Sequence, residues 1–211
     1  MNPTSSSSSA SATRRERERQ ETRDRILDAA RELFVRDGFE KVTMRAIAER
    51  IEYTPTAIYH HFADKDALIT ELCHHDFLAL GVRFARMEKI DDPVERLRKL
   101  GHAYVSFALE HPEQYRFLFM TPHPRLPEKP SKNPEEDAYA LLRVTVEDCI
   151  AQGRLRPEYR DVDRVAQICW SLCHGVVSLH LNFHEDEWVN WQEPRRTADL
   201  AMEAALRGMV K

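Results

Sequence analysis

The chain contains no long apolar run and little glycine, and both features exclude some classes of protein. No stretch approaches the roughly 20 consecutive apolar residues of a membrane-spanning helix, and the N-terminus lacks the apolar segment of a signal peptide. Glycine accounts for six of the 211 residues, and none lies in a Gly-rich loop of the kind that cradles phosphates. We therefore expect a cytoplasmic protein with no membrane partner.

Cysteine is also sparse, and no residue has the setting of a catalytic group. The four cysteines, at positions 73, 149, 169 and 173, fall inside amphipathic segments, which favours reduced core thiols over a disulfide framework. No serine or cysteine has a nucleophile context, and no carboxylate pair stands out from the solvated faces. We predict neither an enzyme nor a bound cofactor.

Charge is abundant but close to balanced. Charged residues make up 31% of the chain and hydrophobic residues 42%, and the net charge is −4. The protein is therefore not a globally basic nucleic-acid binder. Between Arg14 and Arg25, however, six arginines face four acidic residues. This segment is either a solvated helical face or a local basic patch that meets phosphates.

Residues 42–68 have the pattern of two short helices followed by the start of a long third. Thr43 can cap the first helix, and Thr54 can cap the second, with Pro55 at its first position. Ile58 and Phe62, four residues apart, anchor the second helix to a core. The side chains left to face outward suit contacts with phosphates and base edges, and they are Thr54, Thr56, Ala57, Tyr59, His60 and His61.

Helical periodicity continues through the rest of the chain, and we find neither a strand pattern nor an internal repeat. The proline-rich segment 122–134 is expected to be a loop that can be mobile. We predict an all-α protein of about nine helices with a disordered tail at 1–13, a helix-turn-helix domain at 14–66 and a larger helical domain at 67–211. Besides the two short helices, the predicted helices cover 14–37, 65–84, 93–110, 113–120, 135–152, 162–183 and 195–210.

Segment 162–183 is apolar on several faces, so it must be covered on more than one side. Together with the small-residue face of 195–210, it predicts a homodimer interface in the form of a four-helix bundle. A two-fold dimer would place two reading helices in successive major grooves about 34 Å apart. The alternative is that both helices are simply core.

Several fixed spacings between residues 22 and 68 agree with one known pattern. They are T-R-x-x-I-L-D-A-A-x-x-L-F at 22–34, G-F at 38–39, V-T-M-x-x-I-A at 42–48 and T-x-x-x-I-Y-x-H-F-x-x-K-x-x-L at 54–68. This part of the chain resembles the TetR family of transcriptional regulators. The resemblance implies that Thr43, Tyr59, His60 or His61, and Lys65 contact operator DNA, His61 being the matching histidine. With Arg45 and the outward residues of the second short helix, the predicted DNA-binding set is Thr43, Arg45, Thr54, Thr56, Tyr59, His60, His61 and Lys65.

The C-terminal part resembles a ligand-binding domain named for its Trp-His-Gly motif. The resemblance lies in P-E-Q-Y-R-F-L-F-M at 112–120 and in W-S-L-C-H-G at 170–175. It implies a dimeric repressor that releases its operator when a small molecule enters a cavity among the middle helices. Because aromatic residues are more numerous here than a small core requires, we expect a hydrophobic inducer. The predicted ligand-binding residues are Tyr104, Phe107, Tyr115, Phe119, Trp170 and His174.

Two alternatives remain open on the sequence alone. Cys169, Cys173 and His174 share one helix and could sense a metal ion or redox state, but their spacing matches no closed metal motif, so we assign no metal site. The protein could also be a helical sensing protein that does not bind DNA, because Glu52 stands where the family usually has a glycine. A side chain at positive φ costs about 1 kcal/mol, so either this turn differs or the strain is accepted.

Overall fold

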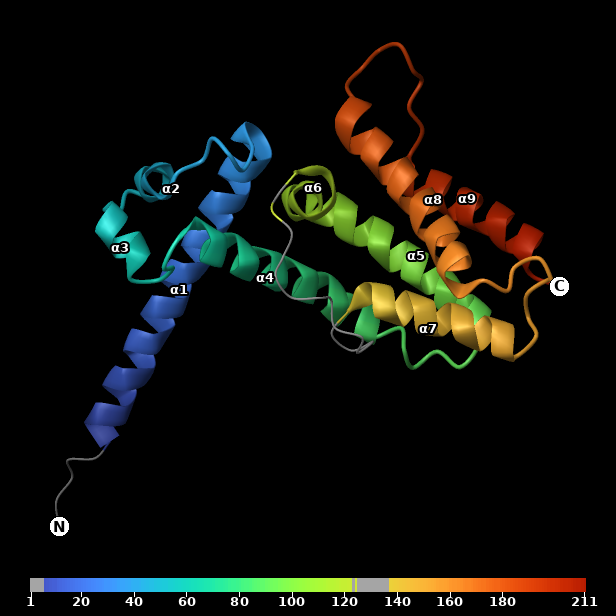
Figure 1. Cartoon of the computed structure of the whole chain (residues 1–211), viewed down its shortest axis with the longest axis horizontal. Coiled ribbons are helices and arrows are strands. Elements are labelled where there is room, and N and C mark those ends of the chain that lie inside the picture. Colours follow the sequence, from blue (N-terminus) through green and yellow to red (C-terminus); the bar gives the residue numbers. More distant parts are fainter. Residues whose placement is uncertain (1–5, 123, 125–136) are drawn as a thin grey trace. The chain divides into compact units, whose positions relative to one another are not determined.

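The computed structural model describes residues 6–122, 124 and 137–211, and over these ranges the chain is all-α (Figure 1). An isolated bridge between Leu155 and Val210 is the only extended pairing in the described ranges. None of the described helices is long and apolar enough to cross a membrane. The prediction of an all-α fold with nine helices is confirmed for this part of the chain, where the helices are α1 (Ser6–Asp37), α2 (Met44–Arg50), α3 (Pro55–Tyr59), α4 (Lys65–Ala85), α5 (Pro93–Glu110), α6 (Pro112–Met120), α7 (Ala138–Ala151), α8 (Val162–Phe183) and α9 (Pro194–Met209).

Helix α1 begins well before its expected start. The prediction of a disordered tail at 1–13 does not hold for residues 6–13, which are helical; residues 1–5 lie outside the described residues. Once a helix has nucleated, each added residue gains a hydrogen bond, so short serine and alanine residues can extend it. At the other end Gly38 has a φ of +80° and donates its N–H to the carbonyl of Phe34 at 3.0 Å, which ends the helix as expected.

The chain forms two compact units, and the main boundary between them falls between Cys73 and His74, inside α4. We expected the domain boundary after residue 66. The first unit contains α1, α2, α3 and the first part of α4. Its core is made of apolar side chains from all four segments, among them Ile26, Ala30, Phe34, Ile47, Ala48, Ile58, Phe62 and Leu68.

The two short helices of the first unit are capped as predicted. The Thr43 hydroxyl accepts from the N–H of Ala46 at 3.1 Å, and the Thr54 hydroxyl accepts from the N–H of Ala57 at 3.3 Å. Between the helices, Glu52 has a φ of +62°. The turn therefore keeps the backbone geometry that a glycine would adopt, and it accepts the strain of a side chain there.

In the second unit α5 packs against α6, α7, α8 and α9. Buried side chains of α5 include Leu97, Leu100, Tyr104 and Phe107. Helix α7 is capped by Asp137 and begins at Ala138. Its expected first residues, and the expected mobile loop at 122–134 except Pro122 and Pro124, lie outside the described residues. The cysteines of both units, at 73, 149, 169 and 173, are buried thiols.

Candidate functional site

Helix α3 presents a polar and aromatic surface to solvent. Ile58 is its buried residue, with no exposed area, whereas Tyr59 is 53% exposed. Thr54, Thr56 and His60 are exposed as well. With five residues and one anchor, most of this helix is available to a partner.

The other predicted DNA contacts, next to α2 and α3, differ in how exposed they are and in whether they already have a partner within the protein. Thr43 is exposed, but its hydroxyl caps α2. Arg45 is exposed and pairs with Glu49 at 2.8 Å on the same helix. His61 is half-buried, and burial, followed by the charge of Arg23, lowers the pKa of its imidazole. At neutral pH this histidine is therefore uncharged.

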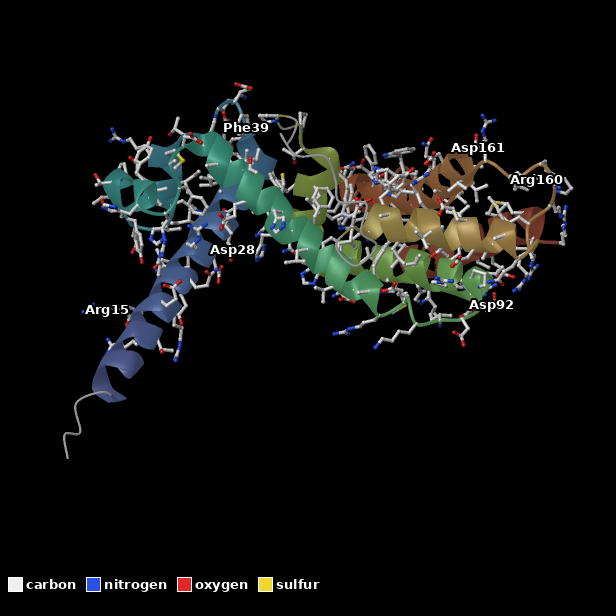
Figure 2. All side chains as sticks on the ribbon, turned by 60° about the horizontal axis from the view of Figure 1, so that its bottom comes forward. Arg15, Asp28, Phe39, Asp92, Arg160 and Asp161 are labelled. Carbon is white, nitrogen blue, oxygen red and sulfur yellow. The ribbon has the colours of Figure 1, made fainter. Side chains whose placement is uncertain are left out.

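Lys65, the first residue of α4, is held inside the first unit. Its ammonium donates to the carbonyls of Phe39 at 2.9 Å and Val42 at 3.1 Å, and it lies 4.1 Å from the centroid of the Phe39 ring. Phe39 lies in the loop between α1 and α2 (Figure 2). Two carbonyl oxygens and an aromatic face offset the unfavourable position of a cation at a helix N-terminus. In this arrangement Lys65 ties the loop after α1 to the start of α4.

Arg23 is an organising residue to which the sequence interpretation gave no role. Its guanidinium donates to the His61 carbonyl at 2.8 Å and to the Glu71 carboxylate, and it stacks 4.5 Å from the centroid of Phe62. It therefore connects α1 with the end of α3 and with α4. The sequence feature that could have identified Arg23 is its position in the T-R pair at 22–23, which belongs to the TetR-like pattern.

The second unit contains a chamber lined by apolar side chains from α4 to α9. Its cavity volume is about 80 Å³. Of the predicted ligand-binding residues, Tyr104, Phe119 and Trp170 line it, whereas Phe107, Tyr115 and His174 do not. The sequence interpretation did not include most of the other lining residues, which are Phe77, Leu80, Phe84, Leu97, Leu100, Gly101, Asp137, Ala138, Tyr139, Leu142, Cys169, Cys173 and Met202.

A chain of hydrogen bonds runs from the chamber wall into the core. Trp170 Nε1 donates to the Tyr104 hydroxyl at 3.0 Å, and this hydroxyl donates to that of Tyr115 at 3.2 Å. The Tyr115 hydroxyl is then left to donate to His174 Nδ1 at 2.6 Å. Burial lowers the pKa of His174 and raises the pKa of both tyrosines. The network is thus uncharged at neutral pH, and Tyr115 and His174 support the chamber from behind.

The chemistry of the second unit does not favour thiolate or metal sensing. Burial raises the pKa of the Cys169 and Cys173 thiols to about 12, so both are protonated at neutral pH and poorly nucleophilic. Over the described ranges no three His, Cys, Asp or Glu side chains are grouped so that they could hold a metal ion.

Two families match different parts of the chain. Residues 26–72 match the family described as "Bacterial regulatory proteins, tetR family". Residues 97–205 match the "Tetracyclin repressor-like, C-terminal domain". This second description does not specify the Trp-His-Gly type, so that narrower assignment stays a prediction.

The curated relatives UidR and AcnR each match less than half of this chain. The HTH-type transcriptional regulator UidR of Escherichia coli K12 is 38% identical over 87 residues, which is 39% of this chain and 44% of the relative. The HTH-type transcriptional repressor AcnR of Corynebacterium diphtheriae is 32% identical over 96 residues, 46% of this chain and 44% of the relative. The matched region thus spans less than half the length of these two relatives.

Solved structures match the fold over nearly the whole chain. A TetR family transcription regulator from Marinobacter aquaeolei VT8 has a TM-score of 0.74 at 19% identity, covering 93% of this chain and 99% of that chain. The ketosteroid transcriptional regulator KstR2 of Mycobacterium tuberculosis has a TM-score of 0.67 at 23% identity, covering 90% and 95%. At these identities the likeness concerns the fold.

Proposed function

Because the chain belongs to the TetR family of bacterial transcriptional regulators, we propose that it represses transcription from an operator until a small hydrophobic molecule enters its chamber. The protein is a regulator of transcription, as its relatives UidR and AcnR are. It is not an enzyme. The observation that carries the proposal is the exposed face of α3, where Thr54, Thr56, Tyr59 and His60 stand free of the core.

In this proposal α2 and α3 form the DNA-reading surface. Hydroxyl, phenol and imidazole groups donate to phosphates or base edges, and the threonine methyl groups suit the methyl group of thymine. Since Lys65 is held by two carbonyl oxygens, its charge would act on a nearby phosphate from a fixed position. The complete proposed set is Thr43, Arg45, Thr54, Thr56, Tyr59, His60, His61 and Lys65.

The chamber of the second unit is the proposed inducer site. Tyr104, Phe119 and Trp170 offer aromatic surface to the ligand. Tyr115 accepts from the Tyr104 hydroxyl, and His174 in turn accepts from Tyr115. Phe107 is 1% exposed and shapes α5 from within the core. A largely apolar lining with few polar atoms suits a hydrophobic molecule.

One helix links the proposed activities. Phe77, Leu80 and Phe84 of α4 line the chamber, and Lys65 at the start of the same helix holds the loop before α2. A ligand that displaces the chamber side chains of α4 would bias the position of the whole helix. The operator is then released if the ligand binds more tightly to a conformation of the protein that has lower affinity for DNA.

The proposed assembly is a homodimer that works in the cytoplasm, where operator DNA is found. Helices α8 and α9 pack together and expose large apolar side chains, with Leu179 50% and Leu200 54% exposed. Covering these residues with a second copy would form the four-helix bundle expected for 162–183 and 195–210.

The proposal is tested by fluorescence anisotropy with labelled duplexes from the DNA that flanks the gene. Tyr59→Ala should weaken operator binding by about 1–3 kcal/mol if the ring reads bases, and Tyr59→Phe by less. We choose Tyr59 over Lys65 for this test, because replacing Lys65 would also break two hydrogen bonds within the first unit.

Tyr159→Ala, in the loop before α8, is the matched control and should bind normally. Titrations at several salt concentrations separate phosphate contacts from base contacts. Unchanged affinity of Tyr59→Ala at every salt concentration would remove Tyr59 from the contact surface. If no flanking fragment binds the unaltered protein, the operator proposal itself fails.

A further inference from the structure

A groove on the second unit adjoins the apolar chamber. It lies between α5 and α9 and has a volume of about 380 Å³. Gly101, Cys173 and Met202 line both the groove and the chamber. At Gly101 the partition is closed by tightly packed side chains, because a Cβ added there would meet Met202 Cε at 2.9 Å and Cys173 Sγ at 3.3 Å. The unbranched Met202 side chain can change rotamer, so the partition can open.

The groove differs from the chamber in charge. Four basic side chains line the groove against two acidic ones, Asp199 and Glu203. Glu95 lies outside the groove and pairs with Arg98 and Lys99. When Glu95 is counted, the basic side chains still outnumber the acidic ones. By contrast, the charged residue that lines the chamber is Asp137, so an anionic group is disfavoured there. The basic residues of the groove are Arg98, Lys99, Arg196 and Arg207.

Two of these arginines, one from α5 and one from α9, converge on a single carboxylate. Arg98 Nη2 lies 3.3 Å from Glu203 Oε2, and Arg207 Nε lies 3.1 Å from Glu203 Oε1. The hydrogen bonds from Arg207 and then Arg98 lower the pKa of Glu203, so it is ionised at neutral pH. Because the Arg207 side chain is 78% exposed, water screens this ion pair and its exchange for another anion costs little.

We propose that the ligand is an amphipathic anion, whose apolar part fills the chamber and whose carboxylate or phosphate group replaces Glu203 between Arg98 and Arg207. The ligand crosses the partition where Met202 moves aside. This inference rests on the proposed function, because it names the chemical class of the molecule that the chamber takes. It adds the α5–α9 groove as the subsite that recognises charge.

The test is isothermal titration of the full chain, without DNA, against decanoate, decyl phosphate and decanol. These probes share one chain length and differ in the head group. Both anions should bind more tightly than the alcohol, by roughly fivefold or more for two surface arginines. The tighter of the two anions identifies the head group that the groove prefers.

Three variants locate the effect. Glu203→Gln should tighten both anions severalfold and leave decanol unchanged, because it removes the carboxylate shared by Arg98 and Arg207, while Arg98 keeps its pair with Glu95. Arg207→Gln should weaken the anions and also leave decanol unchanged. Asp163→Asn, which breaks the 2.7 Å pair with Arg143 elsewhere in the unit, is the matched control and should bind all three probes normally. Circular dichroism melts confirm that each variant is folded.

The outcomes separate this inference from the wider proposal. Equal affinity for decanol and the two anions, unchanged in Glu203→Gln, overturns the anion subsite and leaves the chamber as an apolar ligand site. Absence of binding by all three probes overturns the amphipathic ligand and the hydrophobic inducer together. Failure of the operator titration with anion-selective binding intact would reject DNA binding alone.

Discussion

Glu52 is a single residue in a strained backbone conformation, and its neighbours show how the strain is held. The N–H of Tyr53 bonds to the carbonyl of Ala48 at 2.9 Å, which closes the end of α2. The Arg25 guanidinium stacks 5.2 Å from the centroid of the Tyr53 ring and reaches the Ile51 carbonyl at 3.4 Å. Contacts on both sides of Glu52 thus fix the turn that this residue alone would disfavour.

Replacing Glu52 by glycine should therefore stabilise the protein. Glycine adopts a φ near +62° without a clash of Cβ, so Glu52→Gly should raise the free energy of unfolding by about 1 kcal/mol. The measurement is urea denaturation followed by circular dichroism. Glu49→Gly, inside α2, is the control and should lower stability by about 1 kcal/mol. A loss of stability in Glu52→Gly would mean that the carboxylate stabilises the turn more than φ strains it.

Lys65 shows where residue-level reasoning from sequence reaches its limit. A cation in the first turn of a helix needs a nearby negative partner, and the family resemblance implied that Lys65 contacts operator DNA. In the structure two carbonyl oxygens, of Phe39 and Val42, meet the same electrostatic need. The need was predictable from local physics, but the partner depends on the tertiary path of the chain.

At the scale of elements, local signals predicted most of the first unit. Caps at Thr43 and Thr54, and the helix end at Gly38, need only the neighbouring residues, and all three were predicted correctly. The residues that line the chamber were harder to predict, because they depend on which apolar side chains face a cavity and which pack against other side chains. Phe107 and Phe119 both follow helical periodicity, yet the first is core and the second lines the chamber.

The cap of α3 should matter more than a cap on a longer helix. With five residues, α3 has few internal hydrogen bonds, and the N–H of Ala57 in its first turn is shared between the hydroxyl and the carbonyl of Thr54. Thr54→Ala should lower the free energy of unfolding by about 1 kcal/mol. Thermal melts measure this, and Thr54→Ser should restore most of the loss because it keeps the hydroxyl. Equal destabilisation by both changes would assign the effect to the threonine methyl group instead.

At the scale of the whole molecule, helices α8 and α9 expose an apolar surface that a partner can cover. Leu179 and Phe183 are four residues apart on α8, so they share a face, and they are 50% and 39% exposed. Leu200 on the adjoining α9 is 54% exposed. Exposed apolar side chains of this size on two helices that pack together often mark an interface. A second copy of the chain would cover this surface and place two α3 helices for one operator.

Charge placed on this face should break the dimer. In the double variant Leu179→Glu and Leu200→Glu, four carboxylates would meet across the two-fold axis without partners, so sedimentation velocity at micromolar concentration should give a monomer. Operator affinity should fall with it, since each monomer reads only one half-site. Val82→Glu on α4, where the native side chain is also 54% exposed, is the matched control and should remain dimeric. A dimer that survives the double change would place the interface elsewhere and leave α8 and α9 as the outer wall of the second unit.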